Sequence, residues 1–168
     1  MFTNTLLESA AEVFRGMEID HTVDAENQVI HFGLGLNDGN VEFFAFLDSE
    51  IHVHHLVIRF PIFSQKEHGV RSAEFACRYN MSVMKTALCF DPDTGHWRLR
   101  LLFNRDANGT LNLELFESAI HHLAHHADKL LPTILRLVTN HEKPATLMEQ
   151  LEARLADPDD DEPKEKTE

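Results

Sequence analysis

The sequence has no long apolar run, only two cysteines and nothing that resembles a secretion signal. Its apolar stretches fall short of the ~20 residues that a helix needs to cross a bilayer, which excludes a membrane span. No N-terminal segment combines basic residues, a long apolar core and a small-residue cleavage site. Cys77 and Cys89 stand inside apolar stretches, as small core residues do. We therefore expect a cytoplasmic protein with reduced thiols that needs neither disulfide nor metal to fold.

Positive charge is also scarce. The chain holds 15 lysines and arginines against 28 acidic residues, which gives a formal net charge of −13. Affinity for nucleic acid comes mainly from basic side chains that neutralise phosphates, so this balance argues against a nucleic-acid partner. Residues 157–168 hold seven acidic residues and two lysines, a net of −5, with two prolines. We expect a disordered acidic tail there, which keeps the protein soluble and does not act as a recognition peptide.

Signature motifs of catalysis are missing as well. The sequence contains no Gly-x-Ser-x-Gly elbow, no Gly-x-x-x-x-Gly-Lys phosphate loop and no Gly-x-Gly-x-x-Gly fingerprint. Cys77 and Cys89 are too far apart for a Cys-x-x-Cys motif. Asp91, Asp93 and Asp106 stand in turn-like segments, where aspartates stabilise bends by local hydrogen bonds. These absences predict a protein that is not an enzyme and that carries no cofactor.

What the chain does contain is the helix and strand pattern of one α+β domain. Its length suits one domain. Apolar residues recur at spacings of three and four in the expected helices and alternate in the expected strands. The expected order is a helix over residues 3–17, strands over 19–23, 28–36, 41–47 and 52–60, a helix over 65–80, a hairpin of 83–90 and 96–103, a long helix over 113–137, and a short helix after Lys143-Pro144.

Two prolines set boundaries in this pattern. Pro61 is expected to end the strand before it. Pro132 lies inside the long helix, where it removes a backbone donor, and we expect a bend there because the apolar stripe continues in phase. The prediction is thus an N-terminal helix, an antiparallel sheet of about five strands, a helix inserted before the last hairpin and a long C-terminal helix. Residues 1–141 form the main domain, 142–156 the short terminal helix and 157–168 the tail.

Twelve histidines are the feature that most suggests a metal. His121 and His125, like His122 and His126, are four residues apart on the long helix, so each pair could present two nitrogens to one ion, with Glu117 nearby. However, all four lie beside or opposite the apolar stripe, and the His-Glu-x-x-His spacing is absent. A solvated helix face is the plainer interpretation. A metal site or a pH-responsive cluster is the alternative.

A second group of histidines, His52, His54 and His55, falls on an expected strand. Period two puts His52 and His54 on one face, where they either join a metal site or cap the edge of a half-exposed sheet. If several histidines lie close together in the fold, their shared protonation at about pH 6 would loosen the protein.

The last hairpin carries a possible binding surface. If Trp97 and Leu99 face the core, then Lys85, Arg98 and Arg100 gather on the outer face of the hairpin. Such a basic strip is either ordinary solvent-facing charge or a docking surface for an acidic peptide or another subunit.

The densest pattern lies over residues 72–103. It begins with an expected helix that ends in an Asn, Ala73-Glu74-Phe75-Ala76-Cys77-Arg78-Tyr79-Asn80. It continues with the turn Asp91-Pro92-Asp93-Thr94-Gly95-His96-Trp97. Asp128 and Pro132 follow in the long helix. Over about residues 3–140 this order resembles the bacterial YbjN family, whose fold is that of type III secretion chaperones. The resemblance implies a small non-enzymatic homodimer that binds other proteins, as chaperones hold an extended client segment. Members are also described as sensory-transduction regulators. The histidine-rich helix departs from the family pattern.

These observations lead to one functional prediction and one alternative. The prediction is a protein-binding module, chaperone-like or regulatory, that binds a protein or peptide client. It is expected to form a homodimer through its second helix and the neighbouring hairpin. Neither nucleic acid nor a membrane is expected as a partner. The alternative is a metal-binding or pH-responsive protein. The expected partner-binding residues are Phe75, Arg78, Tyr79, Lys85, Arg98 and Arg100, and the metal candidates of the alternative are His121, His122, His125 and His126.

Overall fold

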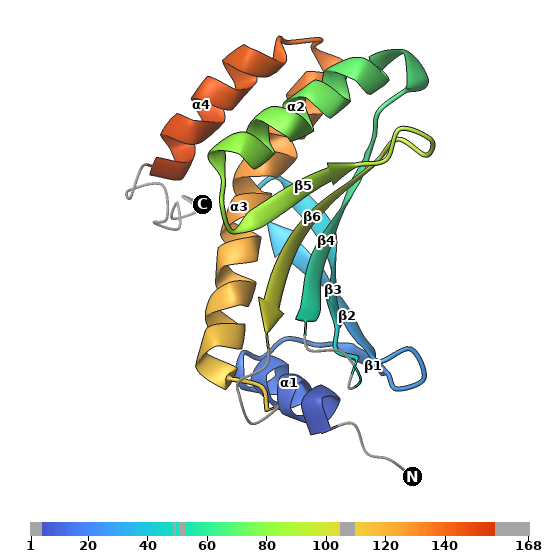
Figure 1. Cartoon of the computed structure of the whole chain (residues 1–168), viewed down its shortest axis with the longest axis vertical. Helices are drawn as coiled ribbons and strands as arrows, with labels where there is room; N and C mark the ends of the chain where they lie inside the picture. Colours follow the sequence, from blue (N-terminus) through green and yellow to red (C-terminus); the bar gives the residue numbers. More distant parts are fainter. Residues whose placement is uncertain (1–4, 49, 51–52, 105–109, 157–168) are drawn as a thin grey trace, which may run out of the picture.

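The chain folds into one six-stranded antiparallel sheet with helices packed against one of its faces (Figure 1). The computed structural model describes residues 5–48, 50, 53–104 and 110–156. The strands lie in the order β1-β2-β3-β4-β6-β5. The elements are α1 (Thr5–Gly16), β1 (Thr22–Asp24), β2 (Val29–Leu36), β3 (Gly39–Phe46), β4 (Val53–Phe63), the 3-10 turn η1 (Lys66–His68), α2 (Gly69–Ser82), β5 (Thr86–Phe90), β6 (His96–Asn104), α3 (Leu113–Thr139) and α4 (Pro144–Ala156).

Alternation along the strands separates a covered face from an open one. On β6, Trp97, Leu99 and Leu101 are buried, whereas Arg98 is exposed and Arg100 is half-buried on the opposite side. The covered face meets α1 through Phe32 and Phe14, whose rings are centred 5.0 Å apart, and α3 through Phe103 and Phe116, whose rings are centred 5.4 Å apart. Burial of this apolar surface is the main source of stability.

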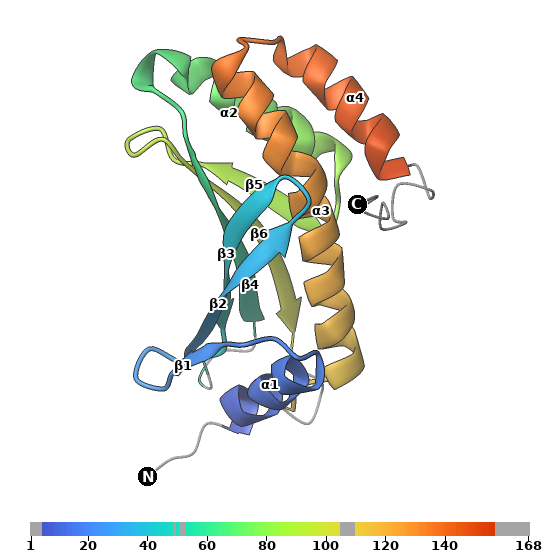
Figure 2. The ribbon, with the colours of Figure 1, turned by 180° about the vertical axis from the view of Figure 1, so that it is seen from behind.

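One of the expected element boundaries is wrong. β4 does not end before Pro61; it continues to Phe63, with a register irregularity against β6 between Arg59 and Phe63. A bulge of this kind accommodates the missing proline donor. The long helix stays continuous through Pro132, and its axis changes direction toward its C-terminal end (Figure 2).

The outer edge of β5 is closed by a side chain. Asn80, near the end of α2, donates from Nδ2 to the carbonyl of Leu88 over 3.0 Å and accepts from the Leu88 N–H over 2.8 Å. Its amide thus makes the two hydrogen bonds that a neighbouring strand would make at this position. The Asn in the pattern of residues 73–80 therefore has a structural role.

The turn between β5 and β6 depends on Gly95. Its φ is +74°, and a Cβ there would lie 2.4 Å from the carbonyl oxygen of Ser64. Asp91 stabilises the turn by accepting from the backbone N–H groups of Asp93 and Thr94. The Ser64 hydroxyl accepts from the indole of Trp97 over 2.9 Å, which ties the hairpin to the segment before α2. Asp106 lies outside the described residues.

Helices α3 and α4 complete the core. Asp128 of α3 accepts two hydrogen bonds from Asn37, in the turn between β2 and β3. α4 packs on α2 and α3, and its buried Leu147 and Leu151 belong to the same core as the sheet. Residues 142–156 are thus not a separate unit. No helix in the described part of the chain has both the length and the apolar content to cross a membrane.

Candidate protein-binding surfaces

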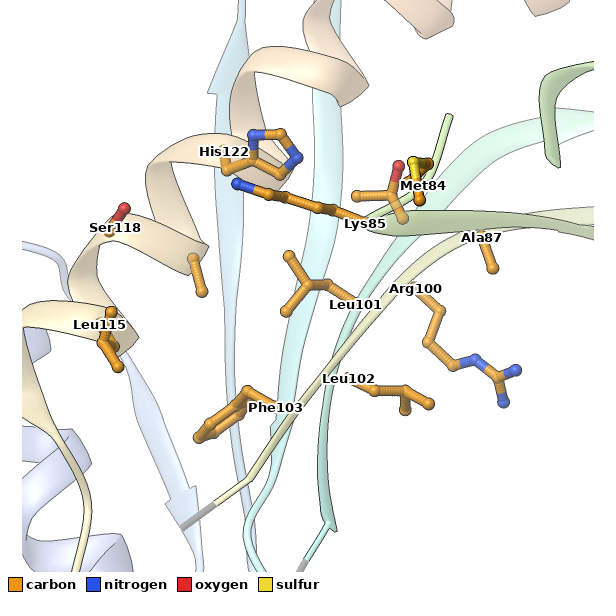
Figure 3. A pocket seen from close by; sticks show the side chains of 12 residues that line it. Met84, Lys85, Ala87, Arg100, Leu101, Leu102, Phe103, Leu115, Ser118 and His122 are labelled. Atoms are coloured by element: carbon orange, nitrogen blue, oxygen red, sulfur yellow. The ribbon is translucent and has the colours of Figure 1, made fainter. Parts of the chain in front are cut away.

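A groove lies between the C-terminal half of β6 and the first half of α3 (Figure 3). We call it the β6 groove; its volume is about 610 Å³. Leu101 and Phe103 of β6 point toward α3 in Figure 3, whereas Arg100 and Leu102 point to the other side of the strand. The lining residues are Met84, Lys85, Thr86, Ala87, Arg100, Leu101, Leu102, Phe103, Leu115, Ser118, Ala119 and His122.

One edge of β6 is unpaired beside this groove. β5 is shorter than β6, and their pairing stops at Thr86 opposite Leu101. Beyond that point Leu102, Phe103 and Asn104 pair with β4 alone among the described strands. An unpaired strand edge presents backbone donors and acceptors to any extended chain that reaches it.

Large apolar side chains are exposed around the same edge. The exposed fractions are 99% for Met84, 68% for Leu115 and 50% for Leu102. Leu113, at the start of α3, is also exposed. The first turn of α3 therefore offers its apolar residues to solvent beside an open strand edge, as interaction surfaces do.

Buried polar groups form a chain near the groove. The hydroxyl of Tyr79 lies 2.6 Å from that of Thr86 and 2.8 Å from Nδ1 of His126. A neutral imidazole accepts at one nitrogen, so the chain is complete when Thr86 donates to Tyr79 and Tyr79 donates to His126. Burial raises the pKa of Tyr79 to about 12, so this phenol stays protonated as a donor.

The same environment keeps His126 neutral. Burial, followed by the positive charge on His122 and His125, lowers the pKa of His126 to about 4. Burial, Lys85 and His125 also lower the pKa of His122. The rings of His122 and His126 are centred 4.4 Å apart. Protonation of either ring therefore opposes protonation of the other.

The expected solvated histidine face is wrong for His126. His126 is 8% exposed, because Tyr79 from α2 covers the side of α3 that the apolar stripe leaves out. His122 and His125 are half-buried, and His121 is exposed. In the described part of the chain, no group of three or more His, Cys, Asp or Glu side chains is placed to hold a metal ion.

The histidines of β4 are separated by the strand. His54 is fully buried, with its ring 5.4 Å from that of Phe103, so the expected position at a half-exposed edge is wrong for this residue. His55 faces the opposite side and is half-buried. His52 lies outside the described residues.

Two of the expected interface anchors lie in the core. Phe75 and Tyr79 are both 0% exposed, so neither ring reaches a partner while the fold is intact. Both rings of α2 point inward, and Phe75 packs against Trp97. Arg78 is exposed and pairs with Glu74 over 2.8 Å.

The expected basic strip is rearranged. Lys85 extends toward His122 in Figure 3, away from Arg100, so it does not share a face with the two arginines. Arg59 of β4 takes its place, because it is directly opposite Arg98 in the β4–β6 register. We call this surface the open face. A hollow of about 620 Å³ lies over it. The open face is defined by Phe44, Phe46, Val57, Arg59, Arg98 and Arg100, and Asp48 adds one carboxylate to the lining of the hollow.

Comparison with known proteins supports the fold. The chain matches no family model and no curated protein. A chain of the solved structure described as "Crystal Structure of the ExsC-ExsE Complex" is similar over 77% of this chain and 96% of its own length, with a TM-score of 0.52 and 19% sequence identity. The expected α+β fold of the type III secretion chaperone kind is therefore confirmed.

Proposed function

We propose that this protein is a non-enzymatic, chaperone-like module that holds an extended segment of a client protein in the β6 groove. The observation that carries the proposal is the coincidence of an unpaired strand edge, Leu102–Asn104, with exposed apolar side chains of α3. The similar solved chain comes from a complex of two proteins, which supports a binding role.

A client segment would add a short strand to β6. Its backbone would pair with the free groups of Leu102 and its neighbours, and its side chains would cover Met84 and Leu115. Backbone pairing tolerates many sequences, whereas the apolar side chains select segments with alternating apolar residues. Such recognition suits a protein that holds unfolded segments.

Leu115 is the residue to test. Binding of a labelled peptide with alternating Val and Thr should weaken about tenfold on Leu115→Gln, because the substitution removes an apolar contact at the groove. Leu135→Gln is the matched control, since Leu135 is 49% exposed farther along the same helix. Amide hydrogen exchange should slow at Leu102–Asn104 when the peptide binds. Unchanged exchange there would contradict the proposal.

We further propose that the protein is a cytoplasmic homodimer related to the YbjN family, with a chaperone or regulatory role. α2 supports this, because it exposes Val70 and Met81, by 86% and 82%, and Met81 shares a surface hollow with Arg78. Light scattering over a concentration series tests it, and Met81→Asp should shift a dimer toward monomer. A monomer at every concentration would contradict the dimer.

A second candidate function, pH response, is favoured by the buried His126 beside the groove. Protonation of His126 would leave the hydrogen bond from Tyr79 without its acceptor and place a charge in the core. The metal-binding version of this alternative has less support, and zinc titration of the purified protein separates the two. A pH effect on peptide binding without zinc binding favours the pH role.

A further inference from the structure

We propose that the open face binds an acidic, extended segment of a partner protein, whose carboxylates lie among Arg59, Arg98 and Arg100 and whose apolar side chains rest on Phe44 and Phe46. This inference rests on the proposed function in one respect, that the protein binds other proteins. It assigns a second surface and the chemistry of its partner.

The first observation is a row of like charges. Arg59 and Arg98 are directly opposite each other on adjacent strands, and Arg100 follows Arg98 by two residues on the same face. Like charges in directly opposite positions repel each other and destabilise a sheet. Glu42 of β3 lies opposite Arg59 and forms an ion pair with it. The charges of Arg98 and Arg100 on β6 are not compensated by this pair.

The second observation is an unsatisfied donor. Arg100 Nε is covered by protein, yet it has no hydrogen-bond partner among the described residues. Arg98 forms no ion pair there, although its charge contributes to the lowered pKa of Asp91. A covered guanidinium donor costs free energy until an acceptor arrives, and a carboxylate is the acceptor that matches its geometry.

The third observation identifies the partner as a polypeptide. Phe44 pairs with Val57, and Val57 pairs with Arg100, so this row of the sheet runs from an apolar floor to an arginine. Phe46, 41% exposed, extends that floor. An acidic chain with interspersed apolar residues matches both parts. Salt screens charges beyond about 8 Å, so an acidic segment bound here responds to these local contacts more than to the net charge of −13.

The chain's own acidic tail is a less suitable occupant. α4 ends at Ala156 and packs against α2 and α3, which cover the other face of the sheet (Figures 1 and 2). A segment that starts there has to pass around the sheet to reach Arg98. An acidic segment of another protein meets no such obstacle.

Fluorescence anisotropy with the full-length chain tests the proposal. The probe is a labelled twelve-residue peptide with the repeat Glu-Phe-Glu-Ser, matched by one with Gln in place of Glu. We expect the Glu peptide to bind at least about tenfold more tightly, and the double variant Arg98→Gln/Arg100→Gln to weaken it at least about tenfold. Arg15→Gln/Lys66→Gln removes the same charge from other exposed positions and should change affinity less than about twofold.

Three further measurements identify the occupant. Leu115→Gln should leave binding of the Glu peptide unchanged. If Leu115→Gln abolishes binding and Arg98→Gln does not, the peptide lies in the β6 groove, and the proposal is overturned. If Asp159→Asn/Asp160→Asn/Asp161→Asn tightens binding tenfold, the tail occupies the face. If the arginine variants change the mass measured by light scattering, a second copy of this chain occupies the open face. If the Glu peptide does not bind a protein that unfolds normally in urea, the proposal for the open face is also overturned. The proposed function of the β6 groove is not affected by that result.

Discussion

The two sides of β6 carry residues of opposite character one position apart. Trp97, Leu99 and Leu101 are packed against helices, whereas Arg98, Arg100 and Leu102 lie on a face that none of the described helices covers. The covered side of β6 holds the fold together through apolar burial and the hydrogen bond from Trp97 to Ser64. The open side contributes little to the fold, so its composition is free to serve partners. Substitutions on the two sides should therefore separate stability from binding.

The largest effect is expected for Trp97→Ala. The indole is fully buried and donates to Ser64, so its removal should lower the free energy of unfolding by about 3–5 kcal/mol. Arg98→Ala, one residue away, should change it by less than about 0.5 kcal/mol. Urea unfolding measures both, and Trp97→Phe serves where Trp97→Ala does not fold. Equal losses at the two positions would erase the distinction between the faces.

A pH effect of about 3 kcal/mol is expected from the buried His126. Its pKa in the folded protein, about 4, lies below its ordinary value of 6.5, so the unfolded chain takes up the proton first. The contribution is fully present above about pH 6.5 and is lost as the pH falls through about 4. His126→Gln should flatten this part of the pH dependence in urea unfolding, whereas His121→Gln, at an exposed position, should not.

The groups that face His126 belong to three elements. They are His122 and His125 on α3, Tyr79 on α2 and Thr86 on β5, and Lys85 acts on His122. If His126→Gln keeps the full loss between pH 6.5 and 4, the acidic side chains and not the imidazole are responsible.

A smaller effect is expected for Asn80→Ala. Loss of its two hydrogen bonds to Leu88 should lower the free energy of unfolding by about 1–2 kcal/mol, and amide exchange at Leu88 should become faster. Asn27→Ala removes one exposed side-chain hydrogen bond, from Asn27 Nδ2 to Asp24, and is the control. If Leu88 exchanges at the same rate in both variants, the edge of β5 is protected by something other than Asn80.

Local sequence patterns predicted the positions of the helices and strands well. They predicted the burial and the neighbours of individual side chains less well. Alternation found the hairpin of β5 and β6 within a few residues, and the turn residues around Gly95 explain why. Burial of His126 and Phe75 was missed because a helical stripe describes one element, whereas His126 is covered by Tyr79 of α2 and Phe75 packs against Trp97 of β6. Arg59 was missed because its place beside Arg98 depends on the pairing of strands far apart in the chain.

The length difference between β5 and β6 sets how long a client would stay. Three residues of β6 extend past the end of β5, about 10 Å of strand, which leaves room for two or three backbone hydrogen bonds. At about 1 kcal/mol each, these bonds alone give an affinity in the millimolar range or weaker. A client held there would exchange rapidly unless its side chains also engage α3, and rapid exchange suits a protein that must release what it binds.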